Sequence, residues 1–353
     1  MRKTERVLAA IAHRQPDRVP KGELGIAPSL RDRLVEGTAA QDACVFEREL
    51  EARRVLDMDL INIHEYPMMA IGTTEDGYTL YRGAFGEEFA DNGVTTRLVK
   101  KAIDDIAECD GYAVPEGPPV TTRFLDYAKA HSDLFCMAQI NGPISALTWM
   151  QGLEDLFEVS MTCLDRVVEI GKITVEYELE RARRFLDHGC DAILIGEDIA
   201  YNRGLLFPPY VMDRLAWPIY RDMIRRIKAY RDVPVFMHTD GDINAALDLI
   251  VDCGFDGLQS LQPSANMDIV KVKREYGDRI CLMGNLDLDW LLPYGTPEEV
   301  AEETRRIVLA CGAGGGFILS TCNILTDMVP PENALAMYRA AGAYGGLIQK
   351  EGK

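Results

Sequence analysis

The sequence lacks the features that mark several common functional classes. It has 38 basic against 56 acidic residues, a formal net charge of −18. Such a surface repels polyanions, so we expect neither a nucleic-acid partner nor binding to an anionic membrane. No stretch approaches the ~18 apolar residues that a membrane-spanning helix needs. The first residues lack the apolar centre of a signal peptide. We therefore expect a cytoplasmic protein.

Paired cysteines and nucleotide-binding glycines are also missing. The nine cysteines include no Cys-x-x-Cys pair, and their number is odd. A secreted disulfide framework is therefore disfavoured, and most of these thiols are expected to be small buried apolar groups. No Gly-x-Gly-x-x-Gly follows the first predicted strand, and no P-loop is found. The motifs most typical of an open, doubly wound sheet are thus absent, which disfavours that fold.

What the sequence does contain is a repeat of short apolar segments separated by helical patterns. The segments predicted as strands are 21–26, 59–66, 134–140, 191–197, 233–237, 256–261, 279–285 and 315–320. Residues 3–13 predict a preceding helix, and the polar–apolar alternation over 77–100 predicts a β-hairpin insertion. The pattern predicts an α/β fold, a (β/α)8 TIM barrel forming one domain over residues 1–353.

Barrel enzymes carry their chemistry at the C-terminal ends of the strands. The polar residues expected there are Glu23, His64, Glu65, Asn141, Glu197, Asp198, His238, Asp240, Asp242, Gln262, Asn285, Asp287, Cys322 and Asn323. The set is rich in carboxylate, amide and imidazole groups, has one thiol, and contains no lysine. It suits a divalent metal better than a phosphate clamp or a Schiff base. Mixed nitrogen, sulfur and oxygen ligands favour zinc.

The end of the fifth predicted strand supplies the strongest candidates. His238, Asp240 and Cys322 could converge on one ion, and Glu197 lies at the end of the neighbouring strand. Asp240 has the better position and Glu197 the longer reach, so both are kept as metal ligands. Each of these residues, taken alone, is more often a hydrogen-bonding polar group of the core than a ligand.

Several stretches resemble the uroporphyrinogen decarboxylase superfamily. They are Thr4–Pro20, Gly284–Asp287 with Gly295–Val300, and Gly316–Ser320 with Pro331–Asn333. The resemblance covers essentially the whole chain and implies a (β/α)8 barrel. In the true decarboxylases an N-terminal arginine-containing segment holds the substrate carboxylates. The corresponding segment here, Lys21–Pro28, has no arginine, which argues against porphyrin decarboxylation.

Another branch of the superfamily contains zinc-dependent, corrinoid-linked methyltransferases. Their zinc motif is His-x-Cys after the fifth strand plus a cysteine after the eighth, so the resemblance implies ligands at His238 and Cys322. Asp240 stands where the first cysteine is expected. A ligand set with one thiolate leaves zinc a stronger Lewis acid, suited to an oxygen substrate. The implied activity is transfer of a methyl group from a small-molecule methyl ether, of aryl type, to cob(I)alamin (cobalamin cofactor) on a partner corrinoid protein.

Substrate-orienting roles follow from the same resemblance. Candidates at the reaction centre are Glu197, Asp240, Asn141 and Asn285, with Asp198 and Tyr201 beside them; Tyr66 and Met68 are candidates for lining the substrate ring or for packing. Two alternatives remain open. One is methyl transfer from a methyl-corrinoid to tetrahydrofolate or a thiol. The other is a barrel without catalytic activity that binds a partner or a small molecule.

Overall fold

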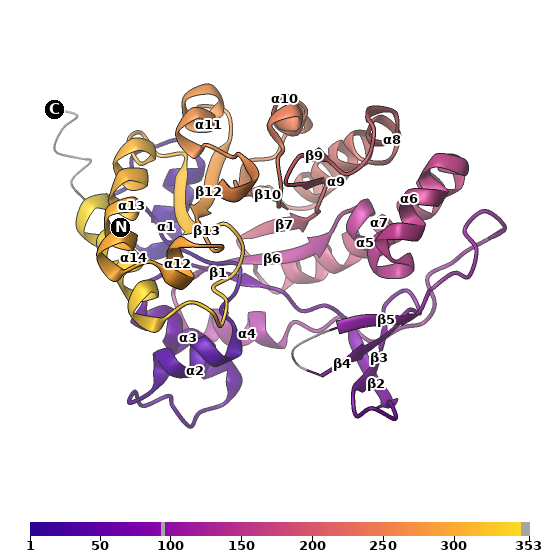
Figure 1. Ribbon diagram of the computed structural model, residues 1–353, viewed down its shortest axis with the longest axis horizontal. Helices are drawn as coiled ribbons and strands as arrows, with labels where there is room; N and C mark the ends of the chain where they lie inside the picture. The colour runs from indigo at the N-terminus through magenta and orange to yellow at the C-terminus, as the bar shows by residue number, and fades with distance from the viewer. Residues whose placement is uncertain (93–95, 347–353) are drawn as a thin grey trace.

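The centre of the molecule is a curled sheet of parallel strands (Figure 1). The computed structural model describes residues 1–92 and 96–346. Seven strands follow one another in the order β1 (Leu60–Ile63), β6 (Phe135–Asn141), β7 (Ala192–Gly196), β10 (Val235–Thr239), β11 (Gly257–Ser260), β12 (Cys281–Leu286) and β13 (Phe317–Thr321). The predicted α/β barrel is confirmed. Residues 347–353 of the predicted domain lie outside the described residues.

The remaining gap between β1 and β13 is filled by the segment around Lys21. Lys21 forms an isolated parallel bridge to Leu319. The Gly22 amide donates to the Leu319 carbonyl at 3.0 Å, and the Asp59 amide donates to the Lys21 carbonyl at 2.7 Å. Isolated bridges therefore replace the continuous strand that was predicted over 21–26, but the segment still completes the ring.

Helices surround the ring on its outer side (Figure 1). They are α1 (Lys3–Ile11), α2 (Pro28–Val35), α3 (Val45–Val55), α4 (Arg123–His131), α5 (Pro143–Gln151), α6 (Leu153–Thr162), α7 (Leu164–Asp187), α8 (Pro209–Leu215), α9 (Trp217–Tyr230), α10 (Leu247–Cys253), α11 (Ile269–Tyr276), α12 (Leu291–Tyr294), α13 (Pro297–Cys311) and α14 (Pro331–Gly345). Two short strands, β8 (Ala200–Tyr201) and β9 (Gly204–Leu205), form a hairpin after β7. No helix in the described ranges is both long and apolar enough to cross a membrane.

The insertion after β1 is larger than predicted. It is a four-stranded antiparallel sheet of β2 (Met68–Thr73), β3 (Thr79–Gly83), β4 (Glu88–Asp91) and β5 (Thr96–Lys100). The predicted hairpin over 77–100 missed β2, because that strand is exposed along most of its length and lacks an alternating pattern. Residues 93–95 of the prediction lie outside the described residues. The β3–β4 turn anchors the sheet through the buried Glu87, which accepts a hydrogen bond from the Tyr66 hydroxyl at 3.0 Å.

The interior of the ring has an apolar lower part and a polar upper part. Leu60, Met137, Leu194, Phe236 and Met283 fill the lower part, and α1 closes its N-terminal end with Val7, Ala10 and Ile11. The space is filled so closely that a Cβ atom on Gly257 would lie 2.1 Å from the Phe236 ring. Inward-facing residues alternate along a strand, so the position two residues after Phe236 is His238. The packed interior therefore supports the polar residues above it.

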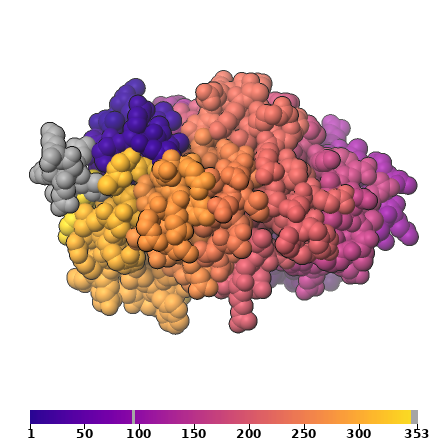
Figure 2. All heavy atoms as spheres, turned by 90° about the horizontal axis from the view of Figure 1, so that it is seen from above, coloured from indigo at the N-terminus to yellow at the C-terminus, as the bar shows by residue number. Residues whose placement is uncertain are grey.

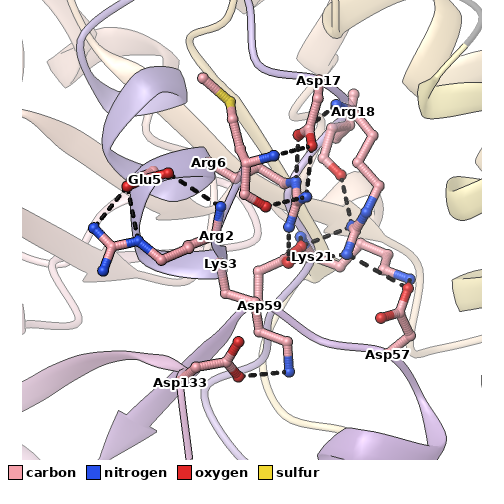
Figure 3. Close-up of polar contacts among 12 residues, drawn as sticks. Arg2, Lys3, Glu5, Arg6, Asp17, Arg18, Lys21, Asp57, Asp59 and Asp133 are labelled. Carbon is pink, nitrogen blue, oxygen red and sulfur yellow. Dashed lines mark hydrogen bonds and ion pairs between the residues drawn. The ribbon is translucent and has the colours of Figure 1, made fainter.

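A buried ion cluster at the N-terminal end joins α1, the closing segment and β1 (Figure 3). The fully buried Asp59 accepts hydrogen bonds from Arg6 Nη1 at 2.7 Å and from both Arg18 Nη atoms at 2.7 and 2.9 Å. It also accepts one from the Lys21 amide at 3.0 Å. The same carboxylate thus holds the closing segment against β1. Figure 2 shows this N-terminal region packed beside the C-terminal part of the chain.

Replacing Asp59 should destabilise the fold strongly. Asp59→Ala leaves the Arg6 and Arg18 guanidinium groups without their buried counter-charge, and breaking such a pair costs about 3–5 kcal/mol. The free energy of unfolding from urea denaturation measures the loss. Asp133→Ala is the matched control, because Asp133 is 66% exposed and pairs only with Lys3 at 3.1 Å among the described contacts. It should cost less than about 0.5 kcal/mol. Equal losses in the two variants would contradict this role of Asp59.

Candidate metal site

Two neighbouring strands bring together three side chains that can bind a metal ion. Asp198 follows β7, His238 lies in β10, and Asp240 follows β10. One ligand atom from each lies within 4.8 Å of the others. Ligands of a tetrahedral zinc ion lie roughly 3.4 Å apart, since each is about 2.0–2.2 Å from the metal. Small side-chain rotations would therefore bring the three onto one ion.

The His238 ring is nearly buried, and its two nitrogens face different side chains. Its Nδ1 lies at hydrogen-bonding distance from Gln259 Oε1 on the adjacent strand β11. Its Nε2 lies 3.9 Å from Asp198 Oδ1. This second distance is too long for a direct hydrogen bond. The Nε2 atom therefore faces the carboxylate cluster without bonding to Asp198.

The Asp240 carboxylate is held on both of its oxygens. Ser260 Oγ donates to Oδ1 and Asn323 Nδ2 donates to Oδ2, each at 2.6 Å. The Asp240 amide donates to Asp198 Oδ1 at 3.1 Å, which joins the two acidic residues. The next residue, Gly241, has φ +90°, and a Cβ there would lie 2.6 Å from the Ala200 backbone. The sharp turn after β10 therefore requires glycine.

Cys322 lies beside these residues but is not one of the three grouped ligands. It follows β13, is buried, and neighbours Asn323, whose amide contacts Asp240. Burial raises the pKa of the Cys322 thiol to about 12, and the negative charge of Asp240 adds to the shift. The thiol is therefore protonated at neutral pH, and a metal would have to displace its proton to bind. Its role as a ligand stays a prediction.

Glu197 points away from the three grouped ligands, toward α5. Its carboxylate accepts hydrogen bonds from the Ile144 and Ser145 amides at 2.8 and 2.9 Å and from the Tyr220 hydroxyl at 2.8 Å. These amides belong to the first turn of α5, where the helix dipole favours an anion. A Cβ on Gly142 would lie 2.5 Å from this carboxylate, so the backbone approaches it closely. The predicted ligand and catalytic roles of Glu197 stay predictions.

The two asparagines predicted at the reaction centre are engaged with the protein. Asn141 Nδ2 donates to the buried Glu178 at 3.3 Å. Asn285 has φ +80°, and its Nδ2 donates to the carbonyls of Leu261 and Met267, the latter at 3.1 Å. The Asn141 amide thus binds a buried carboxylate, and the Asn285 amide stabilises the backbone after β11. Their predicted roles in orienting a substrate stay predictions.

His64, at the end of β1, lies near His238. It is accessible to solvent, yet protein atoms surround much of its ring. This desolvation, with the positive charge of Arg181, lowers the pKa of His64 to about 4. His64 is therefore neutral at pH 7. The neighbouring Tyr66 ring stacks on Trp149 with centroids 6.0 Å apart.

Sequence reasoning did not select Asp198 or Gln259 for the metal site. Asp198 was counted among the polar residues at the strand ends and considered for orienting a substrate, but not chosen as a ligand, although it directly follows Glu197 just after β7, the strand next to β10. That adjacency was a usable signal, since successive residues point to opposite sides of a strand. Gln259 is fully buried within β11 and carries no motif. Only its contact with His238 reveals it.

The buried Glu197 should make stability depend on pH. Burial raises its pKa from 4.5 to about 7, so the folded state holds this proton more tightly than the unfolded chain does. Its contribution to the unfolding free energy is full below pH 4.5 and falls as the pH rises to about 7, by about 3 kcal/mol. Glu197→Gln should flatten the stability curve over this range, as followed by denaturation at several pH values. An unchanged slope would contradict the burial of an ionisable Glu197.

Comparison with known proteins shows which family the chain belongs to. The model of the family described as uroporphyrinogen decarboxylase (URO-D) matches residues 90–344. The uroporphyrinogen decarboxylase of Chlorobium phaeobacteroides is 31% identical over 169 residues, 47% of this chain and 44% of the relative. Methylcobamide:CoM methyltransferase MtaA of Methanosarcina barkeri is 24% identical over 216 residues, 61% of this chain and 60% of the relative. The chain thus spans about half the length of these curated relatives.

Solved structures share the fold. A methyltransferase from Methanosarcina mazei superposes with a TM-score of 0.75 at 20% identity, covering 98% of this chain and 99% of that one. The likeness at this level of identity concerns the fold. The family match, in contrast, covers well over half of the 353 residues, and the chain therefore belongs to the uroporphyrinogen decarboxylase (URO-D) family.

Proposed function

We propose that this chain is a zinc-dependent methyltransferase that takes a methyl group from an aryl methyl ether. The acceptor is cob(I)alamin on a partner corrinoid protein. The observation that carries the proposal is the grouping of Asp198, His238 and Asp240 at the ends of adjacent strands. The similarity to MtaA and the fold shared with the M. mazei methyltransferase support methyl transfer as the class of reaction.

The chemistry of the donor set fits zinc. An imidazole nitrogen, carboxylate oxygens and a thiol are all ligands that zinc accepts. His238, Asp240 and Cys322 would hold the ion, and Asp198 is the better fourth candidate than Glu197. The carboxylate of Asp198 is largely exposed and lies at the cluster, whereas that of Glu197 already accepts three hydrogen bonds from α5 and Tyr220. Zinc bound there would act as a Lewis acid toward the ether oxygen.

The residues of this chain would favour cleavage of a C–O bond. In the reaction the methyl–oxygen bond breaks and its electron pair stays on the leaving phenolate. The methyl group would pass to the corrinoid of the partner protein, which would supply the electron pair for the new bond. Asp240 takes the place of a second thiolate, so the ligand set donates less charge and suits an oxygen leaving group. Its hydrogen bonds from Ser260 and Asn323 fix that carboxylate before the reaction.

Decarboxylation of a porphyrinogen is less well supported. A substrate with many carboxylates needs cations near its binding site. Lys21, the only cation in Lys21–Pro28, binds Asp57 at 2.8 Å at the opposite end of the barrel from the metal-ligand cluster. Arg181 is nearer, but it is buried in an ion pair with Glu178 at 2.6 Å. These two cations are thus already neutralised by the protein.

The reverse direction of transfer is the second candidate. The relative MtaA is named for transfer from a methylcobamide to coenzyme M, a thiol. Transfer from a methyl-corrinoid to a thiol or to tetrahydrofolate would use the same ligands. Asp240 weighs against it, since activation of a thiolate favours a softer, more electron-rich zinc.

Metal analysis tests the ligand assignment. Purified wild-type protein should contain about one zinc ion per chain, as structural and catalytic zinc sites do. His238→Ala and Cys322→Ala should each lose the metal. Cys253→Ala is the matched control, because the Cys253 thiol is buried in α10 and contacts the Trp217 carbonyl; it should keep the metal. Wild-type protein without stoichiometric zinc would refute both zinc-dependent functions.

The direction of transfer is tested with free corrinoids. Zinc-loaded wild-type protein should methylate cob(I)alamin from guaiacol-type ethers, which the visible absorption of the corrinoid reports. His238→Ala should lose this activity by at least ~10²-fold if it removes the Lewis acid. Transfer from methylcobalamin to thiols should be slower than ether cleavage. Faster thiol methylation, with no ether cleavage, would favour the second candidate.

A further inference from the structure

We propose that Gln259 is a positioning residue for the metal site. It holds the His238 ring in the tautomer that carries hydrogen on Nδ1, so that the Nε2 lone pair is free for the metal. The metal-binding part of this inference rests on the proposed function. The tautomer itself follows from hydrogen bonds within the protein and can be measured without metal.

Gln259 is placed opposite His238 by the register of the sheet. His238 in β10 pairs with Gln259 in β11. The Gln259 side chain is fully buried, and its Oε1 is the partner of His238 Nδ1. A buried amide has no water to bond, so its two ends must each find a protein partner.

The orientation of the Gln259 amide is decided by its second contact. Gln259 Nε2 donates to the Thr321 carbonyl at 3.2 Å. A carbonyl oxygen can only accept, so the NH2 end of the amide faces Thr321 and the oxygen end faces His238. That oxygen also only accepts, so Nδ1 of His238 must be the donor. A neutral imidazole carries one N–H, and Nε2 is then left with its lone pair.

The surroundings of Nε2 favour the binding of a cation by this lone pair. Nε2 lies 3.9 Å from Asp198 Oδ1 and receives no hydrogen from it. A positive ion between this nitrogen and the carboxylate would bind both acceptors at once. In metal-binding histidines, a hydrogen bond to the nitrogen that does not bind the metal fixes the tautomer and the orientation of the ring.

Gln259 also links two strands that carry candidate ligands. Thr321 directly precedes Cys322, and its amide and hydroxyl bind Glu23 at 2.7 and 2.8 Å. The acceptor for Gln259 is therefore itself rigidly held. Through this contact the end of β13, with Cys322, is set relative to His238 in β10.

Nitrogen NMR of the metal-free protein tests the tautomer. The chain has five histidines, so the ¹⁵N imidazole signals at about pH 8 can be assigned with His238→Ala. Wild-type His238 should carry its proton on Nδ1. Gln259→Leu should shift it toward the Nε2–H form, and Gln259→Glu should retain Nδ1–H, because a carboxylate still accepts. An Nε2–H signal in the wild type, or no change in Gln259→Leu, would overturn the proposal.

Zinc affinity, measured by competition with a chelator, tests the consequence for the metal. Loss of such a supporting hydrogen bond should weaken binding by about 10–100-fold in Gln259→Leu. Gln139→Leu is the matched control, since Gln139 also lies in a barrel strand but bonds Asn62 at 2.9 Å and not a histidine. It should bind zinc as the wild type does. An equal loss in both variants would overturn a specific role for Gln259.

The two measurements separate this inference from the proposed function. Wild-type protein that binds no zinc but shows the Nδ1–H form would refute the function and keep the tautomer assignment. Zinc binding that is unaffected in Gln259→Leu, with an unchanged tautomer, would refute the positioning role and leave the function standing.

Discussion

Closure of the parallel strands into a ring is the constraint on which the site depends. Seven strands curl around the interior, and the Lys21 segment must fit between β1 and β13 to complete it. Asp59 holds that segment by binding Arg6, Arg18 and the Lys21 amide at once. Because all strands run in one direction, closing the ring brings their C-terminal ends to one face. The candidate metal ligands come together there.

The candidate metal site is the upper layer of the same interior that holds the fold together. Phe236 packs in the apolar lower layer, and His238 follows it two residues later on the same face of β10. On β11, Gln259 likewise follows Gly257 two residues later on the same face. Gly257 has no side chain, which leaves room for the Phe236 ring. The ligands therefore stand on packed, well-ordered strands. A site built in this way needs little rearrangement to receive an ion or to stabilise a developing charge.

The sequence predicted most of the barrel because buried parallel strands are continuous apolar runs between helical patterns. It predicted a continuous strand over 21–26, where the structure has only isolated bridges, and it missed β2, which is exposed along most of its length and lacks an alternating pattern. His238 and Asp240 were predicted as ligands because a polar motif ends an apolar run. Glu197 was kept beside Asp240 for its longer reach. The sequence does not show the direction of a side chain: the Glu197 carboxylate binds the first turn of α5, whereas Asp198 is grouped with His238 and Asp240.

In the proposed function, the replacement of a thiolate by Asp240 distinguishes cleavage of an ether from activation of a thiol. Zinc-edge X-ray absorption of the metal-loaded wild-type protein tests this most directly. The account predicts one sulfur scatterer at about 2.3 Å, from Cys322, with the remaining ligands nitrogen or oxygen at about 2.0–2.2 Å. Two sulfur scatterers, or none, would contradict the mixed ligand set and with it the proposed choice of an oxygen substrate.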